Sequence, residues 1–159
     1  MSPRAAAPAV LLACAVLGAG VAQAATVAGS DVADAVAQKL SASTEVKVTK
    51  MTCPAKVEVR KGERVTCQGR FASGDRTPVT VTLTDDKGAF KARIVNLLMR
   101  HLEDQLEAAV SVKTKVTCPK TRKVKKGDRF TCAVRATNGD KGTFKITQTG
   151  DGLVRYKLA

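Results

Sequence analysis

Tryptophan is absent from this chain, and histidine and tyrosine occur once each in 159 residues. Four phenylalanines complete the aromatic set, so few side chains can stack on nucleic-acid bases or on sugar rings. A single histidine and the lack of a Cys-x-x-Cys pair leave little from which to build a zinc or iron–sulfur site. We therefore expect no metal and no cofactor, and nucleic acid is not the expected partner.

Acidic residues are also scarce, with 14 Asp and Glu against 27 Lys and Arg, a formal net charge of +13. A charge of this size favours polyanionic neighbours, but it says nothing about the fold. Apolar residues make up 44% and charged residues 26% of the chain, values typical of globular proteins rather than of disordered ones.

The first 24 residues have the layout of a secretory signal peptide. A basic head ending at Arg4 is followed by an apolar stretch, and Ala22-Gln-Ala24 forms a small-residue cleavage site. Two alternatives remain: the segment stays as a membrane anchor, or Leu11-Leu-Ala-Cys14 is a lipoprotein box that leaves Cys14 lipidated. Cleavage after Ala24 is the favoured interpretation, giving a secreted protein of the cell envelope with no transmembrane segment.

The remaining chain repeats itself at an offset of 65 residues. Within residues 49–75, 14 of 27 positions are identical to their counterparts in residues 114–140, including Thr-Cys-Pro, Lys-Gly, Thr-Cys and Gly-Asp. Unrelated segments of ordinary composition would share about two. We infer a tandem duplication, with a first copy over residues 25–94 and a second over residues 95–159.

Each copy begins with a helical pattern. In the first, Val32, Val36 and Leu40 fall one turn apart behind Ser30-Asp31. In the second, we expect Asn96 to cap the helix. Its apolar stripe comprises Val95, Leu98, Met99, Leu102, Leu106, Ala109 and Val110.

Alternating strand patterns follow each helix, for example in residues 79–84, 130–135 and 144–147. Gly-containing turns separate them, around Gly62, Gly74, Gly88, Gly139 and Gly150-Asp-Gly152. Each copy is therefore expected to be an α+β unit in which one helix packs on an antiparallel meander of about four strands. The five aromatic side chains, which all fall in these strand patterns, are expected in the cores. They are Phe71, Phe90, Phe130, Phe144 and Tyr156.

Four cysteines remain after signal cleavage, and three pairings are possible in principle. The duplication favours Cys53 with Cys67 and Cys118 with Cys132, each 14 residues apart, so that every copy closes its own disulfide. Units of about 65 residues bury little surface, and such a bond adds about 3 kcal/mol of stability.

The segments Val116-Thr-Cys-Pro119 and Lys126-Gly-Asp-Arg-Phe-Thr-Cys132 resemble the secreted or lipid-anchored actinobacterial family called domain of unknown function 4333. The first copy carries the same pattern in residues 51–54 and 62–67, with Val65 in place of the aromatic residue. The resemblance covers most of residues 46–94 and 111–159. It implies a small extracytoplasmic domain with one disulfide, and it brings no activity and no catalytic residue.

Catalytic patterns are missing from the sequence. The single histidine, His101, flanks the apolar stripe of the second helix, and its counterpart in the first copy is Val36. Asp85-Asp86 and Asp151 fall in turns, where Asp is favoured for backbone reasons. No nucleophile elbow, phosphate-binding Gly-rich loop or His-Glu-x-x-His motif occurs. We expect a protein that is not an enzyme and has no catalytic residues.

A basic run in the second copy provides the functional hypothesis. The candidate polyanion-binding residues are Lys120, Arg122, Lys123, Lys125, Lys126 and Arg129. A disulfide between Cys118 and Cys132 would gather them into one loop that can attract an anionic polymer or lipid surface of the cell envelope. The alternatives are a solvated face that only maintains solubility, or a secreted inhibitor whose loop recognises a protein partner.

Overall fold

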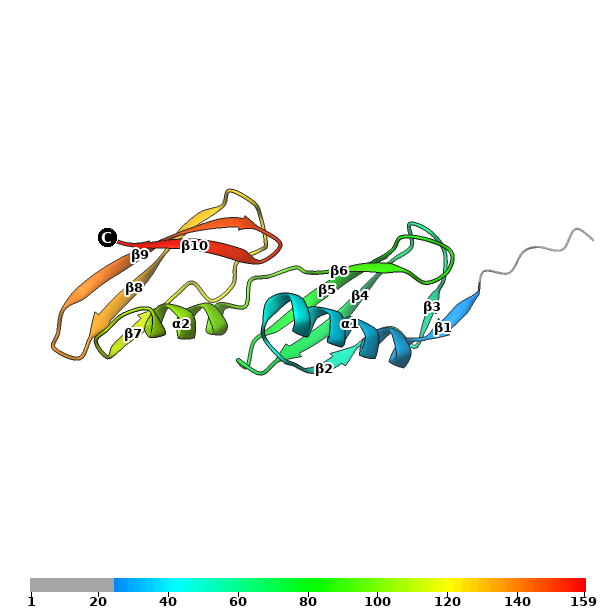
Figure 1. Cartoon of the computed structure of the whole chain (residues 1–159), viewed down its shortest axis with the longest axis horizontal. Helices are drawn as coiled ribbons and strands as arrows, with labels where there is room; N and C mark the ends of the chain where they lie inside the picture. The colour runs from blue at the N-terminus through cyan, green and yellow to red at the C-terminus, as the bar shows by residue number, and fades with distance from the viewer. Residues whose placement is uncertain (1–24) are drawn as a thin grey trace, which may run out of the picture.

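The computed structural model describes residues 25–159, so the expected signal peptide and Cys14 lie outside the described residues. Figure 1 shows two units side by side along the long axis of the molecule, joined by the chain between β6 and α2. No helix within these residues is long and apolar enough to cross a membrane. The elements are β1 (Thr26–Ala28), α1 (Gly29–Thr44), β2 (Val48–Thr52), β3 (Lys56–Glu58), β4 (Arg64–Phe71), β5 (Arg76–Leu83), β6 (Phe90–Ile94), α2 (Met99–Ala108), β7 (Thr114–Thr117), β8 (Arg129–Ala136), β9 (Lys141–Gly150) and β10 (Leu153–Leu158).

The first unit, α1 with β1 to β6, is built on an antiparallel sheet of order β2-β4-β5-β6. Ala33, Val36 and Leu40 recur at helical spacing and are buried. The last two share the core with Cys67 and Val79 of the inner sheet face, the face that the helix covers. A short β1–β3 ribbon completes the unit.

The second unit, α2 with β7 to β10, repeats this plan in the order β7-β8-β9-β10. Leu102 and Leu106 of α2 share a core with Phe130, Phe144 and Ile146 of the inner sheet face. Helix α2 has 10 residues where α1 has 16, and it lies nearest the edge strand β7. The expected α+β fold, with one helix on a four-stranded meander in each copy, is confirmed.

The predicted cap of the second helix is wrong. Asn96 precedes α2 by three positions and is extended, because residues 95–97 pair antiparallel with residues 122–124. The Leu97 N–H donates to the Arg122 carbonyl at 2.7 Å and the Val124 N–H donates to the Val95 carbonyl at 2.8 Å, and this two-stranded pairing requires extended backbone where a helical turn was predicted. This pairing occupies the place that the β1–β3 ribbon has in the first unit.

A side chain from the first unit caps α2 instead. Asp75, in the turn between β4 and β5, accepts hydrogen bonds from the backbone N–H groups of Arg100 and His101, each 3.0 Å long. Thr77 of β5 accepts a further bond from the Asn96 N–H at 2.9 Å. Because unpaired N–H groups at a helix start need an acceptor, these bonds fasten the second unit to the first.

Equivalent turns lead into β4 and β8. Gly62 and Gly127 have φ values of 87° and 81°, a region that suits glycine. Their N–H groups donate to the carbonyls of Leu83 and Gln148, at 2.9 and 2.8 Å. Both copies thus fix the return from the disulfide loop to the central strands in the same way.

The aromatic residues are only partly in the cores. Phe71, Phe130 and Phe144 are buried as expected, whereas Phe90 is half-buried and Tyr156 is 46% exposed. Tyr156 lies on the edge strand β10, in the wall of an open cleft beside α2, and meets Phe144 edge-on at 5.7 Å between ring centres. Its burial was predicted wrongly because strand alternation gives the face of a residue but not the extent of the helix above it.

Candidate polyanion-binding site

The disulfide Cys118–Cys132 closes the loop between β7 and β8, and Cys53–Cys67 closes its counterpart in the first unit. Cys67 and Cys132 are fully buried on the inner faces of their sheets. Both predicted pairings are therefore present, and residues 119–131 form one closed loop, which we call the basic loop.

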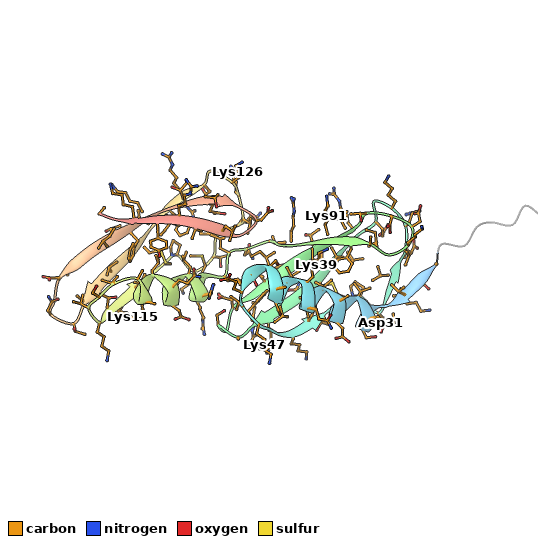
Figure 2. All side chains as sticks on the ribbon, viewed as in Figure 1. Asp31, Lys39, Lys47, Lys91, Lys115 and Lys126 are labelled. Atoms are coloured by element: carbon orange, nitrogen blue, oxygen red, sulfur yellow. A yellow bond between two sulfur atoms is a disulfide. The ribbon has the colours of Figure 1, made fainter. Side chains whose placement is uncertain are left out.

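Four lysines of the basic loop extend into solvent. Lys120, Lys123, Lys125 and Lys126 are exposed, and none has a carboxylate within 4 Å in the described part of the chain. Figure 2 shows Lys126 at the upper edge of the second unit, at the end that is nearest the first unit. Arg129 is also exposed and begins β8. The sequence-predicted cations, with one exception, are thus gathered on one loop and are free to meet an anion.

The exception is Arg122, which the protein uses internally. Its guanidinium lies over the Phe130 ring at 5.0 Å, forms an ion pair with Asp128 at 3.5 Å and donates to the Arg129 carbonyl at 3.0 Å. These contacts hold the two sides of the loop together. Arg122 is a positioning residue within the loop.

A residue that the sequence analysis missed, Gln148, fastens the basic loop to the sheet. It is 1% exposed on the inner face of β9, and its amide oxygen accepts from the Lys125 N–H at 2.7 Å. Its amide nitrogen donates to the Lys123 carbonyl at 3.0 Å and to an Asp128 carboxylate oxygen at 3.1 Å. The signal was available in the repeat: the 65-residue offset places Gln148 where the first copy has the buried Leu83.

The corresponding loop of the first unit is electrically different. Arg60 lies 3.3 Å from Glu63 and 3.8 Å from Glu58, so acids neutralise much of its charge locally. Glu58 stands where the second copy has Lys123. A free cationic loop is therefore a property of the second unit.

Helix α2 holds the start of that loop through two carboxylates. Glu107 accepts from the Val116 N–H at 2.8 Å, and Glu103 accepts from the Cys118 N–H at 2.7 Å. The backbone hydrogen bond from Val116, helped by Lys115 at 3.3 Å, holds the pKa of Glu107 below its ordinary value. One outward N–H group of the edge strand β7 and one just beyond its end are thereby bonded, which disfavours pairing of this edge with other chains.

His101 lies in the wall of a cleft of about 670 Å³ where α2, the end of α1 and the β9–β10 turn meet. The walls combine apolar side chains, including Leu98, Leu102 and Val154, with polar ones such as Gln105 and Asp151. No group of three metal-ligating side chains occurs in residues 25–159. His101 contributes its backbone N–H to the Asp75 contact, which is a structural role.

Comparison with known proteins places both units in one family. The family model described as domain of unknown function (DUF4333) matches twice, over residues 9–88 and 96–152. No match was found among curated proteins or among solved structures. The two matches cover most of the chain and each spans most of one copy, the first beginning within the expected signal peptide, so this protein belongs to the domain of unknown function (DUF4333) family, in two tandem copies.

Proposed function

We propose that this protein is an exported, non-enzymatic binding module of the cell envelope that associates electrostatically with an anionic polymer or lipid surface through the basic loop. The observation that carries the proposal is the group of exposed lysines on a loop held rigid from two sides, by the Cys118–Cys132 disulfide and by buried Gln148. Two disulfides in one small chain agree with an oxidising, extracytoplasmic location.

Rigidity matters because binding then requires little loss of conformational freedom. A flexible lysine-rich tail would have to be ordered, whereas here the backbone of the loop is fixed before the ligand arrives. Each lysine close to an anionic surface contributes about 1 kcal/mol, so four of them suffice for reversible association. This attraction weakens as salt is raised.

The test is retention of the exported, processed protein on anionic vesicles and on isolated envelope polymer across a salt series. Reversal of three loop lysines, Lys123→Glu, Lys125→Glu and Lys126→Glu, should abolish retention. The control reverses three exposed lysines of the first unit, Lys47, Lys56 and Lys87, and changes the net charge equally. Retention that is insensitive to salt, or that survives the loop reversals, contradicts the proposal; salt-independent capture of one defined protein would favour the inhibitor alternative.

A further inference from the structure

The strand register collects the basic residues of the first sheet on a single face. Directly paired residues of antiparallel strands share a face. Lys50 pairs with Arg70 and Arg70 with Arg76, all on the face opposite α1, which we call the outer face. Arg93 and Lys91 join them through Thr80 and Thr82. The outer face of the first sheet carries Lys50, Arg64, Arg70, Arg76, Lys91 and Arg93.

The second sheet repeats the arrangement. Lys115 pairs with Arg135, and Arg135 pairs with Lys141, again on the face opposite the helix. Its outer face carries Lys115, Arg129, Arg135, Lys141, Lys145, Arg155 and Lys157. The eight strands of the two sheets contain no Asp or Glu at all. Two extended cationic faces are the result.

The two copies share this pattern more fully than they share the charge of the basic loop. At the 65-residue offset, Lys50, Arg64, Arg70 and Arg76 correspond to Lys115, Arg129, Arg135 and Lys141. Three loop cations, Lys120, Arg122 and Lys123, have Ala55, Val57 and Glu58 as their counterparts. The outer-face cations are therefore a feature of the repeated unit. In the second copy the basic loop adjoins this face, because Arg129 belongs both to the loop and to the outer face.

Folding gains little from these cations. Like charges directly opposite one another on neighbouring strands destabilise a sheet, and Lys50, Arg70 and Arg76 stand three in a row. Within the described chain, only two of the thirteen have an acidic partner within 4 Å: Arg93 with Asp151 at 3.7 Å, and Lys115 with Glu107 at 3.3 Å. The remaining charges lack an acidic partner within 4 Å inside residues 25–159, so they are available to an anion from solution.

The other outer-face side chains indicate which kind of molecule. Threonines fill the spaces between the cations, and the apolar residues on these faces are small, such as Pro78 and Ala133. The faces hold no aromatic ring to stack on bases and no large apolar side chain to anchor in lipid. Neighbouring strands lie about 4.8 Å apart, and two residues on the same face of one strand lie about 6.7 Å apart. Cations at these intervals suit a linear polymer that carries a negative charge in every repeat.

We propose that the outer faces of the two four-stranded sheets bind a linear anionic polymer, with the guanidinium, ammonium and threonine hydroxyl groups contacting successive charged groups along it. The inference rests on the proposed function, names its ligand class and extends the binding surface from the basic loop to the two sheets. Arginine binds phosphate or carboxylate oxygens in pairs, which adds directionality to the attraction. A polymer that spans many cations gains affinity with length because its later contacts form within the complex.

The experiment measures binding of the exported, processed protein to long-chain inorganic polyphosphate, to tripolyphosphate and to vesicles of phosphatidylglycerol and phosphatidylcholine. Three variants each lose four positive charges by replacement with threonine. The face variant changes Arg70, Arg76, Lys141 and Lys145; the loop variant changes Lys120, Lys123, Lys125 and Lys126; the control changes Lys47, Lys56, Lys87 and Lys113.

We expect the protein to bind long polyphosphate far more tightly than tripolyphosphate. The face variant should lose at least about tenfold in affinity and about three units of the slope of log affinity against log salt, at about 0.7 per lost contact. The control should change much less. Equal losses in the face and control variants would mean that only net charge matters, which overturns the inference.

The remaining outcomes separate the two proposals. Loss in the loop variant with full binding by the face variant overturns the outer-face site and leaves the proposed function standing. Binding to vesicles without binding to polyphosphate overturns the inference that the ligand is a linear anionic polymer. Failure to bind any anionic probe overturns both. If the face variant folds poorly, lysine acetylation of the unaltered protein is measured with and without polyphosphate. Bound polyphosphate must slow the acetylation of Lys91, Lys141 and Lys145 more than that of Lys47 and Lys87.

Discussion

A single polar side chain inside an apolar core organises the basic loop. Gln148 takes the place that Leu83 has in the first unit, and its amide is shared among Lys123, Lys125 and Asp128. A buried amide is tolerated only where its hydrogen bonds are made, and here all of them go to the basic loop, so the side chain holds the loop as well as filling the core. A lone Gln in a strand pattern is not noticed by itself, and only the comparison of the two copies, which sets Gln148 against Leu83, could have pointed to this support.

Gln148→Leu, which restores the first copy's residue type, is expected to lower the free energy of unfolding by about 1–3 kcal/mol, since it leaves buried polar groups of the loop unpaired. Hydrogen exchange at the Lys125 amide should accelerate, while amides of β4 and β5 stay protected. Gln68→Leu, the same change at an exposed strand position, is the control and should alter stability by less than about 0.5 kcal/mol. Unaltered exchange at Lys125 would show that the loop is held by other means.

Glu107 gives the protein a pH-dependent contribution to stability. Its pKa is lowered in the folded state, chiefly by the Val116 N–H, so the ionised carboxylate stabilises the fold. That contribution is complete above the ordinary value of 4.5 and is lost as the pH falls through the lowered folded value. Glu107→Gln should therefore destabilise at about pH 7 and much less at about pH 2. Urea unfolding at both pH values measures this, with Asp104→Asn, at an exposed position, as the control. If the loss of unfolding free energy caused by Glu107→Gln grows on acidification, the prediction is contradicted.

At the scale of elements, α2 depends on a side chain outside its own unit. A stripe of apolar residues predicted the helix correctly, but its ends were set by contacts that are remote in sequence. It starts late because residues 95–97 pair with the basic loop, and it stops at Ala108, before the Ala109 and Val110 of the predicted stripe. Asp75, which precedes the helix by more than 20 residues, could not be identified as its cap from local spacing.

Replacing this cap by Asp75→Ala is expected to destabilise the second unit by about 1–2 kcal/mol, because two N–H groups at the positive end of the helix lose a charged acceptor. Tyr156 is the only tyrosine and lies in the second unit, so its fluorescence during urea unfolding reports on that unit alone. Asp140→Ala is the matched control, since Asp140 is the counterpart of Asp75 and its carboxylate contacts only Asn138 of its own turn. If both substitutions shift the Tyr156 transition equally, the cap has no special role.

At the scale of the whole molecule, the sequence predicted the duplication, the α+β units and both disulfides, because each follows from a local or repeated pattern. The common surface of the thirteen outer-face cations did not emerge from the sequence. They occur in eight separate strands, and only the pairing register brings Lys50 beside Arg70, or Arg135 beside Lys141. A contiguous run such as residues 120–129 is conspicuous in a sequence, whereas a surface assembled across strands is not.

The two units are joined closely enough that unfolding of one should lower the stability of the other. Asp75 and Thr77 of the first unit bond the entry to α2, and Arg93 lies 3.7 Å from Asp151 across the joint. Removing the first disulfide by Cys53→Ala with Cys67→Ala should weaken the first unit by about 3 kcal/mol.

Once the weakened first unit unfolds, α2 loses its cap, and the Tyr156 transition should move to lower urea by about 1–2 M, given about 1–2 kcal/mol for the cap and a slope of about 1 kcal/mol per molar for so small a unit. The double substitution Cys118→Ala with Cys132→Ala serves as the positive control, because it acts on the second unit directly. A Tyr156 midpoint that ignores the loss of the first disulfide would show that the units fold independently. The hydrogen bonds across the joint would then orient the two cationic faces without contributing measurably to the stability of either unit.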